Sequence, residues 1–268
     1  MPSMARQGAG KLNLLERTLP EGLLVDAAWM ERHGYSTSLR SQYVSAGWLT
    51  QPVRGTYKRP RGELTWEKVV VSLQTLLGSG LAVGGRTALD VQGFSHYLSV
   101  SGPSVVHLYG SASPPGWLAR LPLPQTFRFH RSQTLFRTLP EKSGLQEGTL
   151  RQVPVASEWQ LTVSTPERAL LEMLDELPGR EGFHQVDMLM EGLSSLSPRR
   201  LQLLLADCRS VKVKRLFFWF TARHPHAWVK QVDRSTIDLG AGKRALVKGG
   251  KLDSDLLITV PDDLDASV

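Results

Sequence analysis

A helix–glycine–helix pattern followed by a short hairpin constrains the N-terminal fold more than any other feature of the sequence. Helices are predicted over residues 27–33 and 37–46, because an aspartate or a serine precedes each segment as an N-cap and a glycine follows each. Residues 48–50 and 55–58 have the pattern of two short strands around a turn. Two short helices, a tight glycine turn and a hairpin predict a winged helix-turn-helix.

The rest of the chain has the pattern of an α+β protein. Helices are also expected over 11–19, 64–77, 86–92, 166–176, 183–193, 198–208 and 211–224. Strands are expected over 104–109, 126–130, 150–155 and 161–163, and near 235–239 and 244–247. We therefore expect a winged helix-turn-helix DNA-binding domain with a helical extension over 1–94, its core at 11–62. A mixed α+β domain with antiparallel strands and several helices is expected over 95–268.

The formal net charge of +7 is distributed unevenly along the chain. Residues 1–62 carry a net charge of +5 and residues 206–251 a net charge of +8. Residues 161–205, which lie between these two segments, carry a net charge of −3. The tail over 252–268, which follows the second segment, carries a net charge of −5. Because basic segments often meet nucleic acid or acidic surfaces, the two basic segments are the candidate interfaces.

Several classes of protein are excluded by composition. The single cysteine, Cys208, excludes an intrachain disulfide framework and a cysteine-only zinc site, and its position in a helix predicts inert core packing. The first six residues lack the apolar core of a signal peptide, and no apolar run approaches the roughly 18 residues that cross a bilayer. We expect a cytoplasmic protein with no membrane contact, no metal and no cofactor.

The expected helix over 37–46 has a polar face suited to DNA. Leu39, Tyr43 and Ala46 would face the domain core, and small hydroxyls and one amide occupy another face. Such side chains let a helix approach a major groove and bond to base edges or phosphates. DNA contacts are predicted from this helix and the basic wing: Ser36, Thr37, Ser38, Arg40, Ser41, Gln42, Ser45, Arg54, Tyr57, Lys58, Arg59 and Arg61. The alternative is a solvated helix in a winged-helix module that binds no DNA.

The second basic segment begins in the expected helix over 211–224 and continues into two glycine-containing loops. We predict an interaction surface formed by Lys212, Lys214, Arg215, Trp219, Arg223, Lys243, Arg244, Lys248 and Lys251. It would serve a phosphate backbone or an acidic protein partner. The alternative is that Trp219 completes the core and the cations are merely solvated. The loops over 240–244 and 248–251 lack the GxxxxGK[ST] pattern of a P-loop, which argues against nucleotide binding.

No complete catalytic constellation is found in the sequence. His184, Asp187 and Glu191 can share a helix face, but without a matching cluster an exposed polar face is favoured over a metal site. Asp253 and Asp255 suggest the magnesium-binding carboxylates of a nuclease or nucleotidyltransferase. The Gly-Ser turn of a nucleotidyltransferase and the lysine that follows the acids of a nuclease are both missing. We therefore expect no enzyme and keep this magnesium-dependent activity as the alternative.

Several separated segments, in the same order, resemble the AbiEi-type antitoxins of type IV toxin–antitoxin, or abortive infection, systems. These segments are residues 11–15, 43–49, 54–57, 64–67, 84–89, 164–169, 190–193, 210–217 and 249–252. The resemblance extends from residue 11 to about residue 260 and implies a bacterial phage-defence protein and two-domain repressor. It further implies that the winged helix binds inverted repeats in double-stranded DNA of its own promoter. The C-terminal domain would counteract a nucleotidyltransferase-like toxin, a functional opponent with which no stable complex is required.

Overall fold

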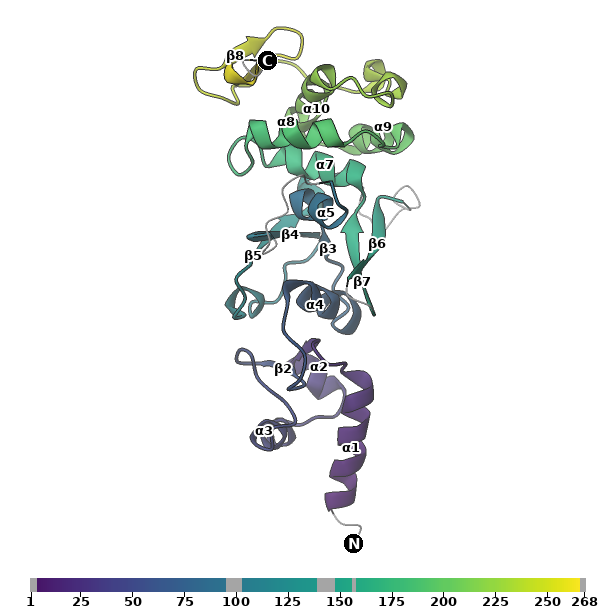
Figure 1. Cartoon of the computed structure of the whole chain (residues 1–268), viewed down its shortest axis with the longest axis vertical. Helices are drawn as coiled ribbons and strands as arrows, with labels where there is room; N and C mark the ends of the chain where they lie inside the picture. The colour runs from purple at the N-terminus through teal and green to yellow at the C-terminus, as the bar shows by residue number, and fades with distance from the viewer. Residues whose placement is uncertain (1–3, 95–102, 139–147, 156–157, 266–268) are drawn as a thin grey trace. The chain divides into compact units, whose positions relative to one another are not determined.

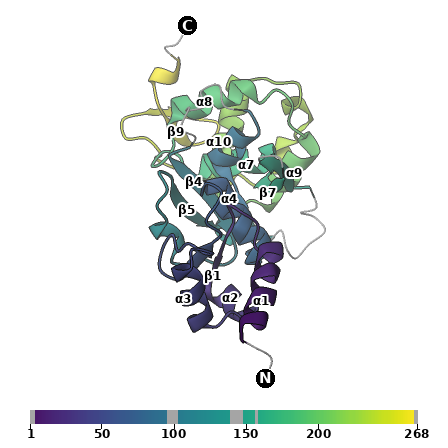
Figure 2. The same cartoon turned by 60° about the horizontal axis from the view of Figure 1, so that its bottom comes forward.

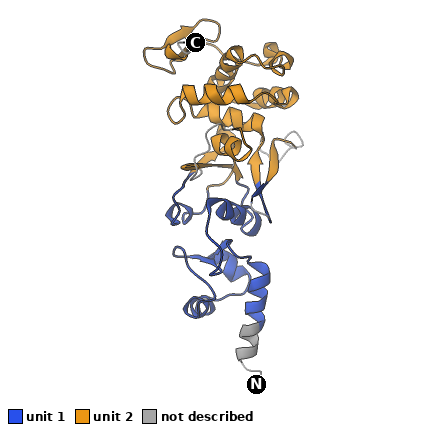
Figure 3. Ribbon diagram, in the orientation of Figure 1, with its two compact units in different colours: residues 1–81, 114–127, 154–161 blue, residues 82–113, 128–153, 162–268 orange. Residues whose placement is uncertain are grey.

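The computed structural model describes residues 4–94, 103–138, 148–155 and 158–265 (Figure 1). The chain forms two compact units (Figure 3). Unit 1 comprises residues 1–81, 114–127 and 154–161, and unit 2 comprises residues 82–113, 128–153 and 162–268. Each unit therefore contains segments that are distant in the sequence.

Unit 1 begins with a winged helix-turn-helix (Figure 2). Its elements are α1 (Met4–Thr18), β1 (Leu24–Asp26), α2 (Ala27–Arg32), α3 (Thr37–Ser45), β2 (Thr56–Lys58), α4 (Trp66–Val71), the π-helical turn η1 (Ser72–Leu76) and the 3₁₀ helix η2 (Leu118–Arg120). The predicted caps are present, because the carboxylate of Asp26 accepts a hydrogen bond from the amide of Trp29 and Ser36 Oγ accepts one from Leu39. These caps satisfy amides that have no partner inside their helices.

The wing differs from the predicted hairpin. β2 pairs antiparallel with β1, with Leu24 opposite Lys58, and β1 was not expected from the sequence. Of the expected strand at 48–50, only Thr50 pairs, in a single bridge to Lys58. β1 is also attached to the helical extension, because Ser72 Oγ in η1 accepts a hydrogen bond from Leu24 N at 2.9 Å.

Most residues of a five-stranded sheet, with the strand order β5-β4-β3-β7-β6, belong to unit 2. These strands are β3 (Ala82–Val83), β4 (Val105–Gly110), β5 (Thr126–Arg131), β6 (Leu150–Val155) and β7 (Trp159–Ser164). The short central strand β3 pairs antiparallel with β4 and parallel with β7. No strand was predicted at this position from the sequence.

Three helices of unit 2 pack against α7, and the unit contains six α-helices in the described residues. They are α5 (Gly85–Val91), α6 (Ser132–Leu135), α7 (Pro166–Asp175), α8 (Phe183–Gly192), α9 (Pro198–Asp207) and α10 (Val211–Arg223). Every residue from Pro166 to Leu174 is buried, and α7 contacts α5, α9 and α10 (Figure 1). Cys208, after α9, is fully buried, as expected, and burial raises the pKa of its thiol to about 11. A helix covered on all sides is the core of its domain.

The end of the chain contains few regular elements. It comprises the 3₁₀ helices η3 (Val229–Gln231), η4 (Arg234–Thr236) and η5 (Asp263–Asp265), with the strand pair β8 (Lys251–Asp253) and β9 (Ile258–Val260). The strands expected near 235–239 and 244–247 are wrong, because the first region contains η4 and the second contributes only a bridge from Arg244 to Ile258. Across the described ranges, no helix combines the length and apolar character that a membrane crossing requires.

Candidate functional site

The α3 face, defined as Ser38, Ser41, Gln42 and Ser45, is exposed in unit 1. Ser36 and Thr37, at the start of the helix, are exposed too. On the opposite side, Tyr43 is buried in the core. The periodicity of the sequence therefore identified the polar side, which is available to a ligand, and the buried Tyr43. Of the other two residues predicted to face the core, Leu39 is half-buried and Ala46 is exposed, so the prediction for Ala46 is wrong.

Arg40 does not lie on this surface, and its predicted contact with a phosphate needs correction. Its side chain is 6% exposed. Nη1 donates to the carbonyl of Ala27 at 2.7 Å, Nη2 donates to Thr37 Oγ1 at 2.8 Å, and the guanidinium lies over the ring of Tyr57. Arg40 therefore fastens α3 to the start of α2, and Tyr57, also buried, completes this packing.

Two cations of the predicted wing surface are engaged inside unit 1. The ammonium of Lys58 lies within hydrogen-bond distance of four carbonyl oxygens of the following loop, at 2.9–3.4 Å from residues 59–62. Burial lowers the pKa of Lys58, and the charge of Lys68 adds to this effect. Arg59 forms an ion pair with Glu21 at 3.0 Å. Both side chains thus shape the loop after β2.

Arg54 and Arg61 are the exposed cations that remain in the predicted wing. Neither forms an ion pair within the described ranges. A further exposed residue, Trp48, follows α3 with 45% of its surface accessible and packs edge-on against Tyr43. Trp48 was not among the predicted DNA contacts, although an aromatic residue directly after the glycine that follows α3 was a usable signal.

The predicted surface on α10 is largely buried, and this part of the prediction is wrong. Lys214, Arg215 and Trp219 are between 1% and 8% exposed. Lys212 donates to the carbonyls of Asp175 and Leu177. These side chains hold neighbouring segments of unit 2 rather than facing a partner.

Arg215 is the centre of this arrangement. Its guanidinium donates to the carbonyls of Leu239, Gly240, Gly242 and Leu257 at 2.7–3.2 Å. Lys214 adds a bond to the carbonyl of Asp238 at 3.0 Å. The glycine loop over 240–244 is therefore arranged around a cation of this chain. Only the loop cations Lys243, Arg244, Lys248 and Lys251 are exposed in the predicted surface.

Arg223, at the end of α10, binds a carboxylate in the middle of α8 instead of standing free. It pairs with Asp187 at 3.0 Å, and His224 reaches the same carboxylate at 2.7 Å. Burial raises the pKa of Asp187, but the hydrogen bonds and charges of Arg223 and His224 outweigh it and hold that pKa below its usual range. The side-chain set His184, Asp187 and Glu191 is thus divided, since His184 pairs with Asp263.

The C-terminal aspartates proposed for magnesium have structural partners. Asp253 Oδ1 accepts hydrogen bonds from the amides of Asp255 and Leu256, which closes the turn between β8 and β9. Asp255 pairs with Arg234 at 2.7 Å. No third carboxylate joins them within metal-binding distance in the described part of the chain.

A buried polar network links α7 to the start of α5, and the sequence analysis missed it. Glu172 bridges Arg168 Nε at 2.7 Å and the amide of Gly85 at 2.9 Å, at the N-terminus of α5. A Cβ on Gly84 would lie 2.3 Å from Glu172 Oε2 and 2.3 Å from Tyr109 Cδ2. Only glycine fits at position 84. Gly84 and Gly85 therefore pack directly against the charged side chains of α7.

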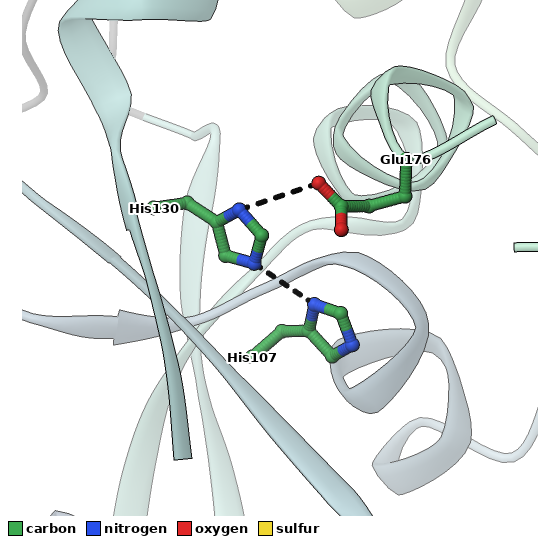
Figure 4. A group of neighbouring side chains, drawn as sticks. All are labelled: His107, His130 and Glu176. Atoms are coloured by element: carbon green, nitrogen blue, oxygen red, sulfur yellow. Dashed lines mark hydrogen bonds and ion pairs between the residues drawn. The ribbon is translucent and has the colours of Figure 1, made fainter. Parts of the chain in front are cut away.

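A second buried cluster joins two histidines and a glutamate (Figure 4). His107 Nδ1 lies 3.0 Å from His130 Nε2, and His130 Nδ1 lies 3.4 Å from the carboxylate of Glu176. Burial lowers the pKa of His107 to about 4, aided by His130 and Arg128 and opposed by Glu176. Burial also lowers the pKa of His130 to about 4, aided by Arg180 and Arg128. Both imidazoles are therefore neutral at pH 7.

Two family models match most of the chain. Residues 103–261 match the family described as "Transcriptional regulator, AbiEi antitoxin, Type IV TA system", and residues 8–100 match "Transcriptional regulator, AbiEi antitoxin N-terminal domain". The chain belongs to the AbiEi antitoxin family. The resemblance of the sequence motifs is thereby confirmed.

A solved structure shares the fold of this AbiEi family member. It is the crystal structure of the RV2827C protein from Mycobacterium tuberculosis, with a TM-score of 0.59 and 16% sequence identity. The similarity covers 95% of this chain and 89% of that protein. No curated protein sequence matches the chain.

The buried network explains two of the segments by which the AbiEi resemblance was recognised. Residues 84–89 begin α5, and residues 164–169 begin α7. Glu172 and Arg168 connect the two segments, and Glu167 accepts hydrogen bonds from the amide of Ser197 and from Arg200 at the start of α9. In this protein these segments position the helices of unit 2.

Proposed function

We propose that this AbiEi protein is a DNA-binding autorepressor and an antitoxin that counteracts a nucleotidyltransferase-like toxin. In this proposal, residues 1–94 bind inverted repeats in the promoter, and residues 95–268 supply the antitoxin activity. The observation that supports DNA binding is the exposed α3 face, accompanied in unit 1 by Arg54 and Arg61, which are exposed and outside any ion pair among the described residues. A small-residue helix face with nearby cations suits groove and phosphate contact.

The antitoxin role is assigned to the exposed loop cations Lys243, Arg244, Lys248 and Lys251. These four replace the α10 side chains of the original prediction, which are used inside unit 2. We further propose that the protein is a bacterial cytoplasmic protein without catalytic activity. The proposed lack of catalytic activity is supported by the structural partners of Asp253 and Asp255.

Fluorescence anisotropy with the protein's own promoter DNA, at two or more salt concentrations, tests the DNA-binding proposal. Arg54→Ala combined with Arg61→Ala removes two exposed cations and leaves the buried contacts of Arg40 and Lys58 intact. We expect weaker binding to every DNA sequence and a salt slope reduced by about 2, one unit for each lost phosphate contact. Ser41→Ala with Gln42→Ala should instead reduce the preference for promoter over unrelated DNA.

A matched control changes the same charge elsewhere. Arg199→Ala combined with Arg209→Ala removes two exposed arginines of unit 2 and should leave promoter affinity unchanged. Equal losses in the two double variants would show that net charge, and not the wing, controls binding. An unchanged salt slope in Arg54→Ala/Arg61→Ala would refute the assigned interface. For the antitoxin role, reversal of the four loop cations to glutamate should abolish rescue of toxin-expressing cells while promoter binding persists.

A further inference from the structure

We infer that His107, His130 and Glu176 form a binding site for a divalent transition-metal ion, with Zn²⁺ as the best-matched cation. The three side chains come from β4, from β5 and from the C-terminal end of α7, and they converge inside unit 2 (Figure 4). One nitrogen of each imidazole and one carboxylate oxygen all lie within 4.8 Å of one another. This inference concerns a site separate from the proposed DNA and antitoxin surfaces.

The spacing of the donor atoms is close to that of a zinc site. Ligands in tetrahedral zinc sites stand about 3.3 Å apart, given bonds of about 2.0–2.1 Å to histidine nitrogen. The His107 Nδ1–His130 Nε2 separation is 3.0 Å, and His130 Nδ1 lies 3.4 Å from Glu176 Oε1. Only one nitrogen of His130 can ligate the ion, so only one of these two separations joins two ligand atoms. The three donor atoms lie within 4.8 Å of one another, so side-chain rotation must bring them to the separation of about 3.3 Å that a zinc site requires.

The three side chains of the cluster are closely packed. His107 and Glu176 are 4% and 7% exposed, and His130 is half-buried. Tyr109 lies flat against His130, with ring centroids 4.5 Å apart and an angle of 12° between the planes. The rings of His107 and His130 are nearly parallel, at 8°. Ligands held in this way lose little conformational entropy when they bind a metal.

The chemistry of the donors selects the metal. Two imidazoles and one carboxylate suit Zn²⁺ and related transition metals, whereas Mg²⁺ and Ca²⁺ prefer sites made only of oxygen. Neutral imidazoles bind without losing a net proton, since a ring that ligates through one nitrogen keeps its hydrogen on the other. Three protein ligands leave a fourth position for water.

Two positive charges, Arg128 and Arg180, act on the cluster and should lower its affinity for a metal cation. Arg180 Nη1 lies 3.4 Å from Glu176 Oε2, and Arg128 acts on both histidines. The Arg180 side chain is 58% exposed, so it can release the carboxylate oxygen into solvent when an ion binds. Arg180→Ala should therefore strengthen zinc binding, an effect that a purely structural hydrogen-bond chain does not produce.

Calorimetry on the full-length protein, stripped with a chelator and titrated with Zn²⁺, tests the site. We expect one ion per chain, with an affinity that falls at least tenfold in Glu176→Gln and in His107→Ala. His184→Ala is the matched control, because His184 is an exposed histidine outside the cluster, and its affinity should equal that of the unchanged protein. Co²⁺ in place of Zn²⁺ should give the visible absorption of a nitrogen- and oxygen-ligated ion, and this absorption should be lost in the same variants.

The isosteric Glu176→Gln keeps the test valid if His107→Ala fails to fold. Circular dichroism identifies the folded variants, and zinc should raise the Tm of the unchanged protein but not that of Glu176→Gln. The inference is refuted if no saturable binding occurs up to 100-fold excess of zinc over protein at micromolar protein concentration. It is also refuted if folded Glu176→Gln binds zinc as tightly as the unchanged protein, which would indicate adventitious surface binding only.

Discussion

Replacing Arg215 with methionine should release the C-terminal segment from α10 without unfolding the rest of unit 2. The guanidinium donates to four carbonyls between Leu239 and Leu257 and is 1% exposed. Methionine keeps most of the aliphatic volume and removes every donor. The carbonyls of the loop would then have to find water, which favours local opening of residues 239–260.

The size of the effect follows from the number of bonds. Each hydrogen bond contributes about 1 kcal/mol net, so four contribute about 4 kcal/mol. The variant no longer buries a charge, and avoiding that desolvation cost offsets about 1 kcal/mol of the loss. The free energy of opening the segment should therefore fall by about 3 kcal/mol. At 1.4 kcal/mol per factor of ten, this corresponds to roughly a 100-fold rise in the population of the opened segment.

Hydrogen–deuterium exchange resolves this effect by segment. The amides of Arg244 and Thr259, which bond across the loop, should exchange roughly 100-fold faster in Arg215→Met, and amides of α7 should keep their rates. Arg209→Met, a change of the same kind at an exposed residue, should alter neither group. Equal acceleration throughout unit 2, or no acceleration between residues 239 and 260, would refute the assignment of Arg215 as the local anchor.

Three further perturbations test other contacts. Arg40→Ala should lower the stability of unit 1 by about 2 kcal/mol, seen in urea unfolding, because two buried hydrogen bonds are lost. Gly84→Ala should lower the Tm strongly, since its Cβ would overlap two side chains, whereas Gly116→Ala, with open space around it, should leave the Tm unchanged. The pKa of Asp187 is lower in the folded state, so its stabilisation is present at neutral pH and is lost as the pH falls below about 4. Asp187→Asn should therefore be less stable than the unchanged protein at pH 7, and the difference in stability should shrink as acid protonates the carboxylate; a difference that stays constant at all pH values would contradict the ion pairs.

The parts of the fold that sequence could predict are those fixed by local signals. Asp26 and Ser36 mark the starts of α2 and α3 because a cap needs only an amide two or three residues away. β3 escaped prediction because Ala82 and Val83 are both buried and too few to show any alternation. A strand of only two residues can be recognised only from the strands that pair with it, here β4 and β7.

The interior cations and the histidine cluster could not be predicted because they depend on tertiary contacts. Arg40 and Arg215 were predicted to lie on polar surfaces of their helices. The sequence could not show which backbone carbonyls their guanidinium groups contact. In the sequence Lys58 has the pattern of an exposed wing cation, because only the folded loop shows that carbonyl oxygens surround its ammonium group. His107 and His130 come from different strands and Glu176 from the end of a helix, so no sequence spacing brings them together.

The bond between Glu172 and the amide of Gly85 spans 87 residues and constrains when unit 2 can form during synthesis. β3 and α5 emerge early from the ribosome, but the strand parallel to β3 and the carboxylate that caps α5 are made much later. Contacts so distant in sequence close only after a large loss of chain entropy, so they slow folding. The winged helix can therefore be complete on a nascent chain whose second unit still lacks its central helix, α7.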